Sequence, residues 1–169
     1  GLKDELLGYS ADQDITILMP TSPTPSNPDT SIIEETIESV RYHLPNARII
    51  LMIDGVREEQ QERLENYNEY IRRLLWICNR KFENIYPMLF GEHTHQAGMT
   101  REALKIVKTP QLLFVEHDTP LTTDREIQWD GLKKCIENGR ANVMRLCHEE
   151  LILPDYQHMV FGGVQPVCG

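Results

Sequence analysis

Several features that would assign a function directly are missing from this sequence. The four cysteines are scattered and none forms a C-x-x-C pair, so zinc-binding and disulfide frameworks find no support. We therefore expect reduced thiols and a cytoplasmic protein. No apolar run approaches the roughly 20 residues that cross a bilayer, which predicts no transmembrane segment.

Positive charge and glycine-rich phosphate loops are also scarce. The 169-residue chain has 17 Lys and Arg residues against 26 Asp and Glu residues, a net charge of −9. Because a phosphate backbone is bound by clustered Lys and Arg, this balance argues against nucleic acid as a partner. The chain contains neither G-x-G-x-x-G nor G-x-x-x-x-G-K-[ST], which argues against a classical dinucleotide site and a P-loop.

Strand and helix patterns alternate along the chain. Pro87 favours an edge position for the third predicted strand, and the proline-rich residues 20–28 predict an irregular loop after the first. Short apolar runs predict five strands, at residues 15–19, 48–53, 85–90, 112–115 and 143–147.

Four helices are predicted between these strands. Capping boxes that begin at Ser31 and Thr123 mark the start of two helices, and Gly139 closes the second of them. Residues 58–81 and 99–108 predict the other two. Strands that alternate with helices predict one α/β domain over residues 1–169, with a mostly parallel open sheet and helices on both faces.

The short acidic sequence Glu116-His117-Asp118 follows the apolar run 111–115. We interpret that run as a strand buried on both faces. Because side chains alternate along a strand, both carboxylates should project to one side and His117 to the other. Hard oxygen ligands at the carboxyl end of a parallel strand suit a divalent metal that carries a phosphorylated ligand.

Other polar residues follow the ends of the first three predicted strands. Thr21 and Ser22 follow the first strand, Asp54 follows the second, and the loop from His93 to Arg101 follows the third. In open α/β sheets, ligands bind beyond the carboxyl ends of the strands. We therefore expect these residues to meet the acidic pair at one edge of the sheet.

The order of these elements resembles a known enzyme family. A strand ends in Pro20-Thr-Ser22, a second ends in an acidic residue, and Gly98-Met-Thr-Arg-Glu-Ala103 precedes Leu-Leu-Phe-Val-Glu-His-Asp118. Together they resemble a nucleotide-sugar glycosyltransferase of the GT-A fold, and are most similar to the large inverting family that includes cellulose and chitin synthases. The resemblance covers residues 15–147 and implies a Rossmann-like nucleotide-binding half.

The resemblance also implies roles for individual residues. Pro20, Thr21 and Ser22 fall where the first exit loop contacts the nucleotide, and Asp54 falls where an acidic residue recognises the base. Arg101 falls where a basic residue faces the base or the diphosphate. Glu116-His117-Asp118 matches the Asp-x-Asp element, although the family has Asp at the first position. Asp118 is then the ligand of Mn²⁺ or Mg²⁺, and Glu116 and His117 belong to the nucleotide-sugar site.

The implied reaction moves a sugar from a nucleoside-diphosphate sugar, with UDP favoured, to a hydroxyl group of a glycan, lipid or protein. An inverting enzyme of this kind needs a carboxylate base that deprotonates the acceptor. Asp155 and Glu150 are the candidates in the short stretch after Asp118. The resemblance therefore implies that the acceptor-binding part is short or missing.

Three other functions stay open at this point. A non-catalytic module that binds a nucleotide or nucleotide sugar would keep the same pocket without a base. A sugar nucleotidyltransferase shares a related sheet, but its glycine-rich first loop is missing here. His93, His95, His117 and Asp118 hold the ingredients of a zinc hydrolase, which usually has three protein ligands and a water on its metal.

Overall fold

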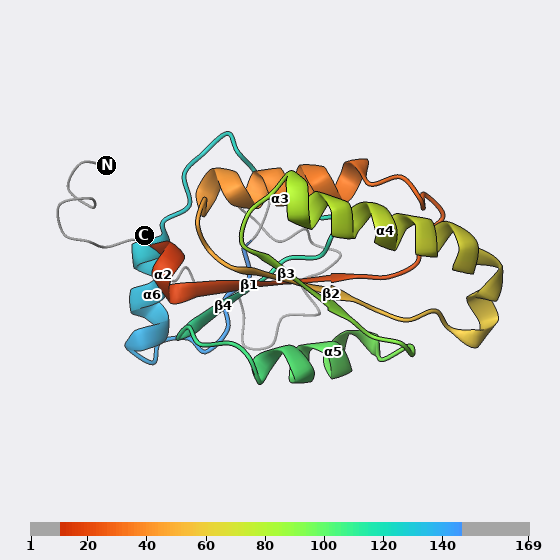
Figure 1. Ribbon diagram of the computed structural model, residues 1–169. Helices are drawn as coiled ribbons and strands as arrows, with labels where there is room; N and C mark the ends of the chain where they lie inside the picture. Colours follow the sequence, from red (N-terminus) through yellow and green to blue (C-terminus); the bar gives the residue numbers. More distant parts are fainter. Residues whose placement is uncertain (1–10, 147–169) are drawn as a thin grey trace, which may run out of the picture. The chain divides into compact units, whose positions relative to one another are not determined.

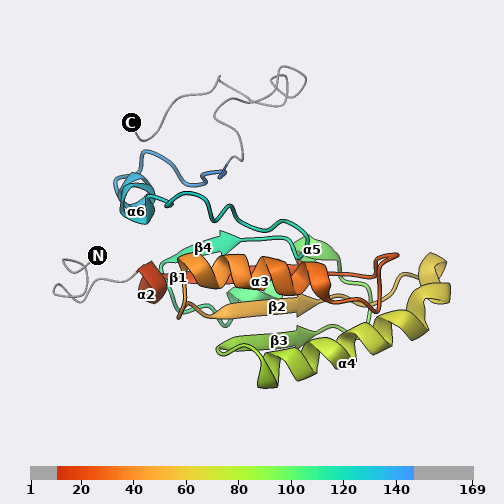
Figure 2. The same cartoon turned by 90° about the horizontal axis from the view of Figure 1, so that it is seen from above.

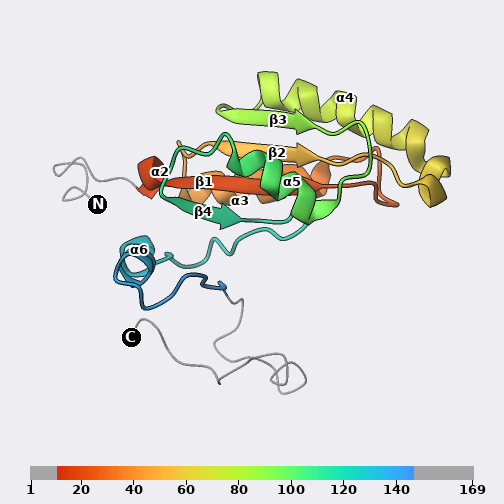
Figure 3. The same cartoon turned by 90° about the horizontal axis from the view of Figure 1, so that it is seen from below.

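Four parallel strands form one open sheet (Figure 1). The computed structural model describes residues 11–146, and the chain divides into two units, Gly1–Thr123 and Asp124–Gly169. The sheet lies in the first unit and has the strand order β3-β2-β1-β4. Its strands are β1 (Ile15–Thr21), β2 (Ile49–Ile53), β3 (Ile85–Leu89) and β4 (Gln111–Phe114). All three strand pairs are parallel, and Figure 3 shows the arrows pointing the same way.

Helices cover both faces of this sheet. The helices α3 (Ser31–His43) and α4 (Leu64–Arg80) lie on one face, and α5 (His95–Leu104) lies on the other (Figures 1 and 2). A short helix, α2 (Ala11–Asp14), precedes β1. The predicted α/β class, a parallel sheet with helices on both faces, is therefore confirmed as a Rossmann-like arrangement.

The hydrophobic core is built around the two central strands. Every residue of β1 and β2 is buried, because alternate side chains meet the helices on opposite faces. On the α5 side, the strand residues pack against Met99 and Ala103. On the other side, α4 buries one stripe at helical spacing, formed by Tyr67, Tyr70, Leu74 and Ile77. Central β1 and β2 thereby fix where their carboxyl ends emerge.

Strand β1 is longer than predicted, because Pro20 belongs to it. Proline removes a backbone donor and is usually excluded from central strands. Here the backbone of Leu18, two residues earlier, faces β4, since its carbonyl accepts the N–H of Val115 at 3.0 Å. The Pro20 backbone faces the same way, but β4 has already ended at Phe114. The missing donor therefore breaks no bond of the ladder, and the strand continues to Thr21.

Several predicted helix boundaries are wrong. Residues 58–81 form a 3₁₀ helix, η1 (Glu58–Arg63), followed by α4, with a kink at Gln60. The η1 sequence has no apolar residue that could pack on the sheet. Ser31 is the first residue of α3 and not its cap, and Thr30 donates to Glu34 at 2.7 Å instead. The helix α5 starts at His95 and not at residue 99, inside the predicted polar loop.

The edge strands give a mixed outcome. β3 is an edge strand of this sheet, as Pro87 predicted. The prediction that β4 is buried on both faces is wrong, since Leu112 is 42% exposed and Phe114 is 41% exposed. Both side chains lie on the α5 side, and the α5 cluster there packs over residues of β1 and β2 such as Leu18.

The second unit contains α6 (Trp129–Glu137), which begins later than the predicted start at Thr123. Gly139 closes this helix as predicted, with a left-handed φ of 69° that favours glycine. Residues 143–146 are not a strand, so the fifth predicted strand is absent there, and Cys147 lies outside the described residues. Within residues 11–146, no helix is both long and apolar enough to cross a membrane.

Candidate functional site

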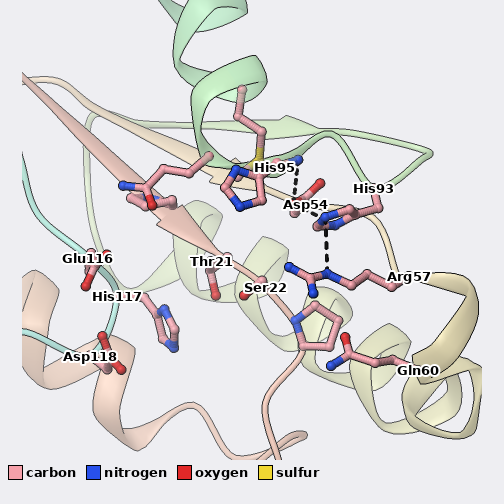
Figure 4. Close-up of a pocket in the computed structure, with 14 residues that line it drawn as sticks. Thr21, Ser22, Asp54, Arg57, Gln60, His93, His95, Glu116, His117 and Asp118 are labelled. Atoms are coloured by element: carbon pink, nitrogen blue, oxygen red, sulfur yellow. Dashed lines mark hydrogen bonds and ion pairs between the residues drawn. The ribbon is translucent and has the colours of Figure 1, made fainter.

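A polar pocket of about 350 Å³ lies at the carboxyl ends of β1 and β2 (Figure 4). Seven of the residues predicted from the sequence line it: Pro20, Thr21, Ser22, Asp54, Glu116, His117 and Asp118. Seven further residues complete the lining: Pro23, Arg57, Gln60, His93, His95, Gln96 and Met99. The expected convergence at one edge of the sheet is therefore present.

One predicted site residue in the described part of the chain does not line this pocket. Arg101 lies farther along α5, where it is exposed and lines a shallow hollow beside Leu104. It is two residues beyond Met99, about 200° around the helix from that pocket-lining side chain. The two proposed catalytic carboxylates, Glu150 and Asp155, lie outside the described residues.

Glu116, His117 and Asp118 form the acidic side of the pocket (Figure 4). Both carboxylate residues are exposed and His117 is half-buried. β4 ends before this segment, so the strand alternation that was predicted to turn His117 away does not apply, and all three residues line the pocket. The segment is held on α3, because the Thr36 hydroxyl donates to the carbonyl of His117 at 2.7 Å.

Asp54 at the end of β2 is the most buried acidic side chain of the site, with 3% of its surface exposed. Its Oδ1 accepts the backbone N–H of Gly55 at 2.8 Å and that of Thr94 at 2.7 Å. Its Oδ2 accepts the N–H of His95 at 3.0 Å and lies 3.1 Å from Nδ1 of His93. A carboxylate offers about four lone-pair directions, and all of them are used within the protein.

These bonds attach the loop before α5 to the end of β2. A Cβ atom on Gly55 would lie 2.3 Å from the backbone carbon of Glu92, so only glycine allows the two segments to approach this closely. His95 has a φ of 66°, a left-handed conformation that is unfavourable for a residue with a Cβ. The bond from the His95 N–H to Asp54 stabilises that conformation and places the loop at the pocket.

His93 and Arg57 extend this network along one side of the pocket. Nε of Arg57 lies 3.2 Å from Nε2 of His93. Nε of arginine can only donate, so Nε2 of His93 carries the lone pair. The ring proton is then on Nδ1 and is donated to Asp54. Figure 4 shows the resulting row of Asp54, His93 and Arg57, with the guanidinium reaching toward the middle of the pocket.

Two tyrosines of α4 form hydrogen bonds with residues that line the pocket. The hydroxyl of Tyr67 donates to the backbone carbonyl of Asp54 at 2.6 Å. The hydroxyls of Tyr70 and Thr21 form a buried hydrogen bond of 2.7 Å. Burial raises the pKa of Tyr70 to about 12, the bond to Thr21 opposes this rise, and the negative charge of Asp118 adds to it. The Thr21 side chain is therefore engaged beneath the pocket surface.

The donor groups around the pocket can be tested against two classes of metal. Within residues 11–146, no group of three or more His, Cys, Asp or Glu side chains is arranged to hold a metal ion. A zinc hydrolase site, which needs three such ligands, gains no support from this part of the chain. Mg²⁺ is usually bound by one or two carboxylates together with substrate phosphates and water, and the exposed Asp118 and Glu116 fit that requirement.

Sequence reasoning missed Arg57 and Gln60 because both fall in a charge-rich segment that reads as a solvated surface. It expected the loop that holds His93 and His95 to reach this edge of the sheet, and both residues line the pocket. The signal that could have found Arg57 and Gln60 is Asp54-Gly55 at a strand end, since the following residues must then leave the sheet beside the site. No protein-family model matches the chain, and no curated protein matches it either.

Proposed function

We propose that this protein is a metal-dependent glycosyltransferase that moves a sugar from a nucleoside-diphosphate sugar, with UDP favoured, to a hydroxyl acceptor. The observation that carries the proposal is the convergence of β1, β2 and the Glu116-His117-Asp118 segment on one polar pocket. In parallel α/β sheets, this edge is where nucleotides bind. A volume of about 350 Å³ is within the range of small-molecule sites.

The acidic side of the pocket supports a metal-bound diphosphate. Asp118 would hold Mg²⁺ or Mn²⁺, with Glu116 as a second or water-mediated ligand. The metal, when bound, neutralises the negative charge that grows on the leaving nucleoside diphosphate. Pro20, Ser22 and the backbone of Thr21 form the surface along which the donor would extend, because the Thr21 hydroxyl already bonds to Tyr70.

The acceptor half of the reaction rests on residues beyond those described. An inverting transferase deprotonates the acceptor hydroxyl with a carboxylate, and Glu150 and Asp155 remain our candidates for this base. The acceptor is a hydroxyl group of a glycan, lipid or protein. A cytoplasmic location completes the proposal.

One observation favours a second candidate, a module that binds a nucleotide sugar without turning it over. Among the described lining residues, the carboxylates are Asp54, Glu116 and Asp118. Asp54 is fully hydrogen-bonded, and the other two are assigned to the metal side. A base is therefore missing from the described part of the pocket, which is the composition that a binding module would have.

Calorimetric titration of the full chain with UDP, with and without Mn²⁺, tests the proposal. We expect UDP binding that requires Mn²⁺ and that Asp118→Ala weakens more than about tenfold, or 1.4 kcal/mol. Glu62→Ala is the matched control, since it removes a carboxylate whose side chain is 70% exposed on η1. A UDP affinity that is unchanged both by Mn²⁺ and by Asp118→Ala would refute the proposal.

A turnover assay then separates the two candidates. Release of UDP from a UDP-sugar in the presence of Mn²⁺, even by slow hydrolysis, would support a transferase. Metal-dependent binding without any release would support the binding module instead.

A further inference from the structure

The end of β2 offers a ligand a distinctive set of hydrogen-bonding groups. Both carboxylate oxygens of Asp54 are occupied by three backbone N–H groups and by the ring of His93. The remaining ring nitrogen of His93 accepts from Nε of Arg57. The acceptors of this row are thus all used, and the groups left over are N–H donors of the Arg57 guanidinium.

The orientation of Arg57 follows from its bond to His93. A guanidinium has five N–H donors in a rigid planar fork, and His93 takes the one on Nε. Within residues 11–146, no hydrogen bond or ion pair engages Nη1 or Nη2 of Arg57, whose side chain is directed toward the middle of the pocket (Figure 4). Four donors in one plane are therefore available, and the exposed bond from Nε of Arg57 to His93 directs them into the pocket.

The acidic side of the pocket determines which part of the ligand meets Arg57. Glu116 and Asp118 lie across the pocket from Arg57, with Thr21 and Ser22 between them (Figure 4). If the metal and diphosphate occupy the acidic side, the nucleoside extends over Ser22 toward Arg57. The group that meets the guanidinium is then an edge of the base and not a phosphate.

We propose that Arg57, held by the Asp54–His93 row, recognises the base of the nucleotide through a ring carbonyl oxygen. This inference rests on the proposed function and names its specificity-determining residue. Because the row offers donors and no acceptor, a pyrimidine with a carbonyl oxygen at C4, as in uracil, is favoured over one with an amino group there, as in cytosine, and the C2 carbonyl is common to both bases. Placing an amino group against the fork would set donors against donors, so the hydrogen bond to the guanidinium would be lost.

The assignment differs from the one that the sequence suggested. The family resemblance gives base recognition to Asp54, yet the lone pairs of Asp54 are already used and cannot accept an N–H from the base. It also gives a basic role to Arg101, which lies outside the pocket. In the structure, Asp54 acts on the ligand indirectly, since it orients His93 and His93 orients Arg57.

The test compares ligands and variants by calorimetry in the presence of Mn²⁺. We expect the protein to bind UDP up to about tenfold more tightly than CDP, because the C4 amino group of cytosine replaces the acceptor of the hydrogen bond from the exposed Arg57 by a donor. Arg57→Met should weaken UDP binding about tenfold and equalise UDP and CDP. Arg72→Met is the control, since Arg72 on α4 has a side chain that is 76% exposed.

Two further arms identify what Arg57 contacts. Pyrophosphate carries no base, so Arg57→Met should leave Mn²⁺-dependent pyrophosphate binding unchanged, and an equal loss there would overturn the carbonyl assignment. Arg57→Lys keeps the charge and the donors but not the planar fork, so it should weaken UDP binding and reduce the preference for UDP over CDP. Full selectivity in Arg57→Lys would overturn the role of the fork.

The failure of this inference is distinguishable from that of the proposed function. If UDP does not bind in a metal-dependent manner, the proposed function fails. If UDP binds with Mn²⁺ but Arg57→Met changes neither its affinity nor the UDP-to-CDP ratio, only the role of Arg57 fails.

Discussion

Replacing Asp54 with Asn tests whether this carboxylate organises the site or binds the ligand. In the structure its two oxygens accept three backbone N–H groups and face His93. Asn keeps one oxygen and replaces the other by an amino group, which cannot accept. If the oxygen stays at the Oδ1 position, the bonds to Gly55 and Thr94 survive, and the amino group faces the N–H of His95.

The cost can be worked out from these contacts. Asp54 is 3% exposed, so water does not readily replace the lost acceptor. A hydrogen bond to a charged group contributes about 1.5–3 kcal/mol, and a buried donor without a partner costs about 1–3 kcal/mol. The left-handed conformation of His95 loses its stabilising bond as well. We expect Asp54→Asn to lower the free energy of unfolding by about 2–4 kcal/mol.

Urea denaturation followed by circular dichroism measures this change. Asp29→Asn is a suitable control, because Asp29 also accepts one backbone N–H, from Ser31, but at an exposed position; its effect should be much smaller. A loss below about 0.5 kcal/mol for Asp54→Asn, together with abolished UDP binding, would refute the reasoning. That result would mean that the carboxylate is free to bind the base, as the family resemblance implies.

Three other predictions concern the surroundings of the site and the helices. Gly55→Ala should displace the loop at Glu92, because the added Cβ would overlap the backbone of Glu92. We expect a lower melting temperature and weaker UDP binding. An unchanged melting temperature would contradict the close approach of Gly55 to Glu92. The hydrogen bond from Lys81 holds the pKa of Glu34 below its usual value. The ionised Glu34 carboxylate therefore stabilises the fold at any pH above that usual value, and this stabilisation is lost as the pH falls through the lowered pKa. Glu34→Gln should therefore be less stable than the wild type in urea at pH 7 but not at strongly acidic pH, and equal stability at pH 7 would refute the link. Burial raises the pKa of Cys78 to about 11, so iodoacetamide should modify it slowly at pH 8, as measured by peptide mapping, and rapid modification would show that the thiol is accessible.

The sheet could be predicted because its central strands carry a strong local signal. The apolar runs that form β1 and β2 are buried completely, and Pro87 correctly indicated an edge. The extension of β1 through Pro20 could not be predicted, because it depends on where β4 ends. That end is a property of the partner strand and is not encoded next to Pro20.

The start of α5 depends on a contact that no local pattern records. His95 opens the helix with a left-handed φ, and the acceptor that stabilises its N–H is Asp54, 41 residues earlier in the chain. The sequence signals that mark the start of a helix lie in neighbouring residues only. The loop was therefore predicted to continue to residue 98, and the helical conformation that begins at His95 was not anticipated.

The candidate site was predicted where strand ends alone determine a position. Ser22, Asp54 and Asp118 line the pocket for this reason. Arg101 was selected by its place in a motif, but its side of α5 is set by how Met99 and Ala103 pack on the sheet. Arg57 enters the pocket through a hydrogen bond to a histidine of another loop, a contact that requires the tertiary structure.

The charges that line the pocket determine how a nucleotide would have to bind. Asp54, Glu116 and Asp118 are acidic, while Arg57 is the basic residue among the described lining residues. The buried charge of Asp54 is directed to the loop and to His93, so Glu116 and Asp118 remain facing the space that a diphosphate would fill. A diphosphate brought there alone would be repelled, and a divalent cation bound between the two reverses the sign of that interaction. Nucleotide affinity should therefore depend on the metal far more than on Arg57, which selects the base after the charges have been balanced.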